Sequence, residues 1–138
     1  MTDRGVSKED FQIISALPAD VPSYLSAADA GLAFIKNCFS KQASSPTKYA
    51  EYLGCGLPLV INAGIGDSDA LIDDEKVGVL VRRFDQEEYT RAAAAIGVMT
   101  NDVEQTRART REVAERLLDV RRVGRERYVA LYEQVLAS

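Results

Sequence analysis

Short apolar runs alternate with polar segments along most of the chain. Four runs have the length of a buried strand, and they cover residues 11–16, 30–35, 57–62 and 77–81. Segments with helical periodicity or helix-start signals lie between and after them, at residues 20–25, 46–54, 68–73, 85–96, 101–120 and 125–136. Strands that alternate with helices are typical of βαβ units. The pattern therefore predicts an α/β fold, a Rossmann-like parallel sheet flanked by helices, and it leaves the strand order open.

Two early helices have clear start signals. Asp20 is a suitable N-cap, and the first turn after it tolerates the proline at position 22. Ser45 is predicted as the N-cap of the next helix, with Pro46 as its first helical residue. A glycine at 54 or 56 ends that helix. Residues 36–43 are polar and irregular, and we expect a loop there.

The second half of the chain has similar boundary signals. Residues 63–66 read as a turn, and Asp67 or Ser68 caps the short helix after it. Asp85 caps the helix that follows the fourth apolar run. That helix has apolar positions at Tyr89, Ala92, Ala93 and Ile96.

The C-terminal segment is helical and amphipathic. Gly124 interrupts the pattern, and the last helix, about residues 123–137, has one apolar stripe. The stripe consists of Tyr128, Leu131, Tyr132 and Val135. Packing on its own domain and exposure to a partner both fit this stripe.

Composition narrows the class of protein. The chain has 138 residues, enough for one domain, and 46% of them are hydrophobic. Charged residues make up 28%, with a net charge of -4. The basic cluster from Arg107 to Arg127 is interleaved with Glu and Asp, which indicates a solvated helix face. A net negative charge and mixed charges along the basic segment predict no nucleic-acid surface.

Missing residue types exclude several chemistries. There is no histidine, which removes Ser-His-Asp triads and most zinc sites. Cys38 and Cys55 are too far apart for a metal knuckle, and both suit a reducing cytosol. No apolar run approaches the ~18 residues of a membrane span, and residues 1–4 begin no signal peptide. We therefore expect a cytoplasmic chain with no metal and no cofactor.

One segment has the pattern of an anion site. Ligands of open α/β sheets bind beyond the carboxyl ends of the strands, where the helix that starts near Pro46 is expected to begin. Its backbone N–H groups and positive dipole end favour a diphosphate, and Glu51 shares a helix face with Thr47. A carboxylate there is well placed for both hydroxyls of a ribose. The candidate residues are Ser44, Ser45, Pro46, Thr47, Lys48 and Glu51.

Simpler explanations of these residues remain open. Ser-Pro is a common helix start, and Glu51 also suits a plain surface position. Gly64 and Gly66 lie in a second candidate phosphate loop, because glycine lets backbone approach a ligand, although an ordinary tight turn explains them as well. Lys36 and Lys41 are expected on the ligand side, where a lone lysine is usually solvated.

Three blocks of the sequence resemble the C-terminal domain of GT-B glycosyltransferases, most closely the large group 1 (retaining) family. The blocks cover residues 21–32, 45–60 and 77–81, and the middle one reads Ser-Pro-Thr-Lys-Tyr-Ala-Glu-Tyr-Leu-Gly-Cys-Gly-Leu-Pro-Leu-Val. The resemblance extends over about residues 10–97 and the tyrosine-bearing last helix. It implies a domain that binds a nucleoside diphosphate sugar for transfer to an acceptor hydroxyl, without a bound metal.

The resemblance also implies roles for single residues. Glu51 matches the second glutamate of the paired-glutamate motif, the residue expected to hold the donor ribose. Pro46, Thr47 and Lys48 match the segment that lines the diphosphate. The first glutamate would fall at Ala43, so the chain departs from the motif there and instead resembles a serine-proline-x-lysine subgroup. The catalytic residues stay unassigned.

The resemblance implies a longer protein. Neither a glycine-rich turn nor the family's early phosphate-binding residues are recognisable after residues 11–16. We therefore expect an absent N-terminal acceptor domain that the last helix contacts, with a homodimer through that helix as the other option. The parent enzyme would be cytoplasmic or peripheral at the inner membrane. Half of a GT-B nucleotide-sugar epimerase and a non-catalytic α/β binding module are the alternative functions.

Overall fold

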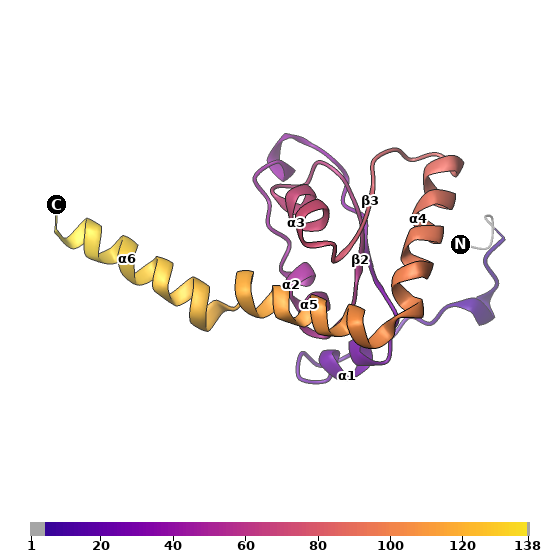
Figure 1. Cartoon of the computed structure of the whole chain (residues 1–138), viewed down its shortest axis with the longest axis horizontal. Coiled ribbons are helices and arrows are strands. Elements are labelled where there is room, and N and C mark those ends of the chain that lie inside the picture. The colour runs from indigo at the N-terminus through magenta and orange to yellow at the C-terminus, as the bar shows by residue number, and fades with distance from the viewer. Residues whose placement is uncertain (1–4, 138) are drawn as a thin grey trace.

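The computed structural model describes residues 5–137 and has helices on both faces of a parallel sheet (Figure 1). The sheet has three strands in the order β1-β2-β3, with Gly31 opposite Leu59 and Leu59 opposite Gly78. This is an open α/β arrangement of the Rossmann-like type, as the sequence predicts. The strands are β1 (Gly31–Ala33), β2 (Leu59–Asn62) and β3 (Gly78–Val81).

Six α-helices and three short helical turns make up most of the rest of the described chain. The α-helices are α1 (Val21–Ser26), α2 (Thr47–Gly54), α3 (Ser68–Glu75), α4 (Gln86–Asn101), α5 (Val103–Leu117) and α6 (Arg125–Leu136). The short turns are two 3-10 helices, Lys8–Asp10 and Phe39–Lys41, and a π-helical turn, Val120–Gly124.

The core lies on both faces of the sheet. One face packs against α2, α3 and α5. The core on this side of the sheet contains the fully buried Leu53, Leu59 and Val77. The other face packs Val60 and Val79 against α4. A parallel sheet has to bury both faces, which explains why β2 is buried at every position.

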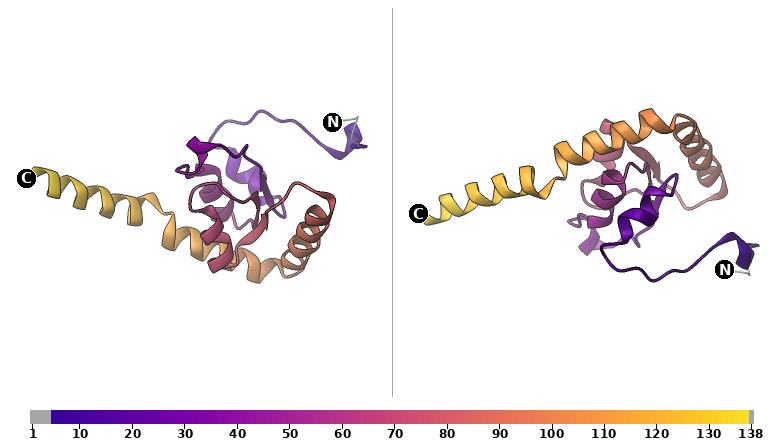
Figure 2. Two further views of the ribbon diagram at one scale, coloured as in Figure 1. Left: turned by 90° about the horizontal axis from the view of Figure 1, so that it is seen from above. Right: turned by 90° about the horizontal axis from the view of Figure 1, so that it is seen from below.

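The first predicted strand is wrong. Residues 11–16 form no strand, and Ile13 is 88% exposed. A strand needs a neighbour to pair its backbone groups and cover its apolar side chains, and this segment leads away from the sheet (Figure 2). An apolar run carries no information on whether such a neighbour is within reach.

The predicted buried strand at residues 30–35 is shorter and less buried than expected. It forms β1 at the edge of the sheet, and its central side chain, Leu32, is 61% exposed. Phe34 is also exposed and packs edge-on against Phe84, with ring centroids 6.3 Å apart. α4 covers β2 and β3 but leaves this face of β1 open, so the prediction of full burial is wrong.

Several helix boundaries also differ from the predictions. Pro46 is the N-cap of α2 rather than its first residue, so Ser45 does not cap the helix. α3 continues beyond Asp73 to Glu75 and ends at Lys76, whose φ is +56°. The predicted cap at Asp85 is confirmed, because its carboxylate accepts a hydrogen bond from the Glu88 N–H at 2.8 Å.

The apolar stripe predicted for α4 is only partly confirmed. Ala92 is buried and Ile96 packs beside it, but Tyr89 and Ala93 are exposed. Glu88 takes the buried position one turn before Ala92, which no apolar pattern predicts.

The C-terminal region also differs. The predicted helix 101–120 ends at Leu117, and the Asp119 carboxylate caps the next turn by accepting hydrogen bonds from two backbone N–H groups. Gly124 does not break the helical structure, because the π-helical turn runs directly into α6. α6 projects from the body with its apolar stripe exposed, and Leu131 is 55% exposed (Figures 1 and 2). Among the described residues, no helix combines the length and apolarity needed to cross a membrane.

Glu88 gives the fold a testable pH dependence. Glu88 is 6% exposed, and its carboxylate accepts hydrogen bonds from the Arg91 guanidinium and from the Arg82 N–H at 2.8 Å. These bonds, Arg91 first, lower the pKa of Glu88 to about 2. The folded pKa lies below the unfolded value of about 4.3, so this stabilisation is present above about pH 5 and is lost as the pH falls toward 2.

We therefore expect Glu88→Gln to flatten the decrease in unfolding free energy between pH 5 and pH 2. Urea titrations at several pH values measure this slope. Glu87→Gln is the control, because Glu87 is exposed and its ion pair with Arg83 is long, at 3.6 Å. An unchanged slope in Glu88→Gln would contradict the assignment.

Candidate functional site

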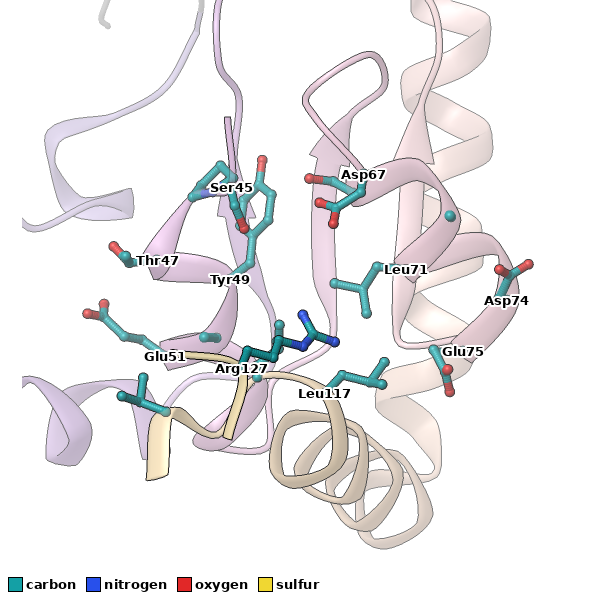
Figure 3. A pocket seen from close by; sticks show the side chains of 16 residues that line it. Ser45, Thr47, Tyr49, Glu51, Asp67, Leu71, Asp74, Glu75, Leu117 and Arg127 are labelled. Atoms are coloured by element: carbon teal, nitrogen blue, oxygen red, sulfur yellow. The ribbon is translucent and has the colours of Figure 1, made fainter. Parts of the chain in front are cut away.

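A groove of about 640 Å³ lies between α2 and α3 (Figure 3). One wall comes from the start of α2 and the residues just before it, and the other from α3. Leu117, Leu118, Val120 and Arg127 close the end near α5 and α6. Four of the predicted site residues line this groove: Ser45, Pro46, Thr47 and Glu51.

The start of α2 is open to a ligand. It follows β1 at the carboxyl edge of the sheet, where α/β sheets bind their ligands. Its N-cap is Pro46, which has no polar side chain to occupy the first N–H groups. These N–H groups and the positive end of the helix dipole favour an anion.

Thr47 and Glu51 lie one helical turn apart on the same side of α2. Figure 3 shows the oxygen atoms of both side chains pointing to that side, away from α3. Both side chains are exposed. The structure thus brings together the pair that the i, i+4 spacing predicts.

Glu51 also borders a second hollow, of about 400 Å³, between α1 and α2. The walls of this hollow are mainly apolar. Its lining includes Pro18, Val21, Pro22, Leu25, Ala50 and Cys55. Glu51 therefore stands between a polar helix start and an apolar hollow.

The remaining predicted residues do not line the groove. Lys48 is exposed on α2, and Lys36 is exposed in the loop after β1. The N–H of Gly64 donates to the Asp69 carboxylate at 3.0 Å, and the N–H of Gly66 donates to the Lys41 carbonyl at 3.0 Å. These two N–H groups are engaged within the protein, which agrees with a tight turn.

Ser44 lies beside this turn. A Cβ on Gly66 would meet the Ser44 carbonyl oxygen at 2.0 Å, so the two backbones are in close contact. The loop before α2 and the turn before α3 therefore support each other at the carboxyl edge of the sheet. We infer that Ser44, Gly64 and Gly66 position the start of α2.

Charge is unevenly distributed in the groove. Its lining includes four carboxylates, from Glu51, Asp67, Asp74 and Glu75, and the single cation Arg127. Glu75 is paired with Arg116 at 2.6 Å. A diphosphate therefore fits at the start of α2, where hydroxyls and helix N–H groups lie, and not farther along α3 beside Asp74 and Glu75.

Two groove residues were missed from the sequence. Tyr49 looks like an ordinary core residue of α2, and it lies on the buried face with Leu53. Arg127 belongs to α6, 76 positions after Glu51, and only the path of the C-terminal helices brings it to the groove. It has no ion pair among residues 5–137, and no local motif distinguishes it from the neighbouring arginines.

No protein-family model, curated protein or solved structure matches the chain. The groove, the helix start and the resemblance of the three sequence blocks are therefore the features that indicate a function.

Proposed function

We propose that this chain is the donor-binding domain of a GT-B glycosyltransferase, and that it binds a nucleoside diphosphate sugar. The observation that carries the proposal is the arrangement of Thr47 and Glu51 on one side of α2, at a helix start beyond the carboxyl edge of a parallel sheet. This arrangement combines the anion-binding start of α2 with the Glu51 carboxylate one helical turn away.

Each part of the donor has its own position beside α2. The diphosphate lies at the start of α2, against the hydroxyls of Ser45 and Thr47 and the helix N–H groups. Lys36 and Lys48 add positive charge from outside the groove. Glu51 accepts hydrogen bonds from the ribose hydroxyls. The base occupies the apolar hollow between α1 and α2, next to Glu51.

The chemistry is transfer of the sugar to an acceptor hydroxyl. The positive end of α2 stabilises the charge that develops on the leaving diphosphate. The acceptor binds to a second domain, and α6 is the contact to that domain. Its exposed Tyr128, Leu131 and Tyr132 support this role, since large apolar side chains that gather on one exposed face commonly mark an interaction site.

Calorimetric or NMR titrations with UDP-, GDP- and ADP-sugars test the proposal. We expect one of them to bind, and Glu51→Gln to weaken it about 10-fold or more, because a charge-assisted pair of ribose hydrogen bonds is lost. Glu115→Gln is the matched control, since Glu115 is an exposed carboxylate on α5 outside the groove. Failure of all three donors to bind would refute the proposal.

A further inference from the structure

The Tyr49 hydroxyl is a buried polar group that lacks a partner. Within residues 5–137, two buried side-chain atoms have no hydrogen bond, Tyr49 Oη and Arg109 Nε. The Arg109 guanidinium has further N–H donors, whereas the hydroxyl is the only polar group of the Tyr49 side chain. Tyr49 is 3% exposed, so its hydroxyl lies out of reach of bulk solvent. A buried polar group in this state destabilises the fold, so a role outside the fold should explain it.

The position of the hydroxyl points to a ligand. The Tyr49 ring packs in the core with Leu53 and Ile72, whereas Figure 3 shows the hydroxyl pointing toward the starts of α2 and α3, between Ser45 and Asp67. The ring thus belongs to the core and the oxygen to the carboxyl edge of the sheet. This is also the end of the groove to which the uncapped start of α2 belongs.

The chemistry of the hydroxyl selects an acceptor as its partner. Burial, with a smaller effect of the Asp69 carboxylate, raises the pKa of Tyr49. The group is therefore a neutral O–H at physiological pH, and its strongest hydrogen bond is to an anionic oxygen. The Asp69 carboxylate accepts from the Gly64 N–H at 3.0 Å, and the Tyr49 hydroxyl donates no hydrogen bond to it.

We propose that the Tyr49 hydroxyl donates a hydrogen bond to a diphosphate oxygen of the ligand at the start of α2. This inference rests on the proposed function and adds a diphosphate-binding residue that lies on the buried side of the helix. The N–H groups at the start of α2 then contact the diphosphate from one side and Tyr49 contacts it from the other. Because surrounding atoms cover the hydroxyl, binding includes a small movement of those atoms.

Tyr49→Phe tests this inference, because it removes the oxygen and keeps the ring. We expect the affinity for the bound nucleotide, and for inorganic pyrophosphate, to fall about 10-fold, the size typical of one hydrogen bond to a charged group. We also expect the midpoint of urea unfolding to stay constant or rise, since the change removes an unpaired buried polar group. If the hydroxyl instead stabilised the fold, the midpoint of urea unfolding would fall in Tyr49→Phe. Tyr52→Phe is the matched control, since Tyr52 is a half-buried tyrosine of the same helix outside the groove.

The outcomes separate this inference from the proposed function. Equal affinity of Tyr49→Phe and the original protein, with weaker binding by Glu51→Gln, would refute the role of Tyr49 and leave the proposed function in place. Loss of stability in Tyr49→Phe without loss of affinity would also refute it. Binding of pyrophosphate alone, weakened by Tyr49→Phe, would support Tyr49 and refute the nucleotide part of the function. No binding of any nucleotide or of pyrophosphate would overturn both.

Discussion

Replacement of Gly66 by alanine should lower the free energy of unfolding by about 3 kcal/mol, a large part of the stability of a domain of this size. Two separate costs contribute to this value. The φ of Gly66 is +53°, a left-handed conformation that costs an alanine about 1–2 kcal/mol. The added Cβ would also lie 2.0 Å from the Ser44 carbonyl oxygen, so the backbone there has to move.

The effect should extend to the groove. The Gly66 N–H donates to the Lys41 carbonyl at 3.0 Å, which ties the turn after β2 to the loop that leads into α2. Displacement of Ser44 shifts the start of α2, which is the proposed diphosphate site. We therefore expect Gly66→Ala to weaken nucleotide binding even under conditions where the variant is folded.

Urea unfolding, followed by circular dichroism, measures the change. Gly54→Ala is the matched control, because a Cβ at Gly54 meets nothing within 4 Å and the residue lies in the last turn of α2. We expect that control to be neutral or to gain up to about 1 kcal/mol from the higher helix propensity of alanine. Equal unfolding curves for Gly66→Ala and the original protein would show that the turn is loosely packed.

Local signals in the sequence predicted most of the helical structure. The aspartate at 85 precedes its helix by one residue and caps it, and the glycines near the end of α2 stop that helix as expected. The apolar runs that became β2 and β3 were also recognised, because strands of a parallel sheet that helices cover on both faces are mostly apolar on both faces. These features depend on neighbours in the sequence or on burial from both faces.

The errors arose where a distant contact decides the structure. Residues 11–16 have the composition of a strand but no paired neighbour, and β1 lacks a helix over one of its faces. The site also combines features that local sequence predicts with features that distant contacts decide. The i, i+4 spacing placed Thr47 and Glu51 together, whereas the unpaired hydroxyl of Tyr49 and the approach of Arg127 depend on packing between elements far apart in the chain.

Replacement of Leu53 by alanine should destabilise the protein by about 2–5 kcal/mol, the usual cost of a large cavity in a core. Leu53 is 0% exposed and lies on the buried face of α2. It belongs to the cluster that joins this helix to the sheet and to Val113 of α5. Loss of its side chain therefore removes contacts from three elements at once, including the helix that carries Thr47 and Glu51.

Leu131→Ala provides the comparison, because it makes the same chemical change on the exposed stripe of α6. Truncation of an exposed leucine usually changes stability by less than about 0.5 kcal/mol, so the two variants should differ several-fold in the loss of unfolding free energy. Urea unfolding at two protein concentrations measures both. A large loss in Leu131→Ala that depends on concentration would show that α6 is buried against a second copy. A concentration-independent loss would show that α6 packs on its own domain, and either result would contradict an α6 that is free to contact the acceptor domain.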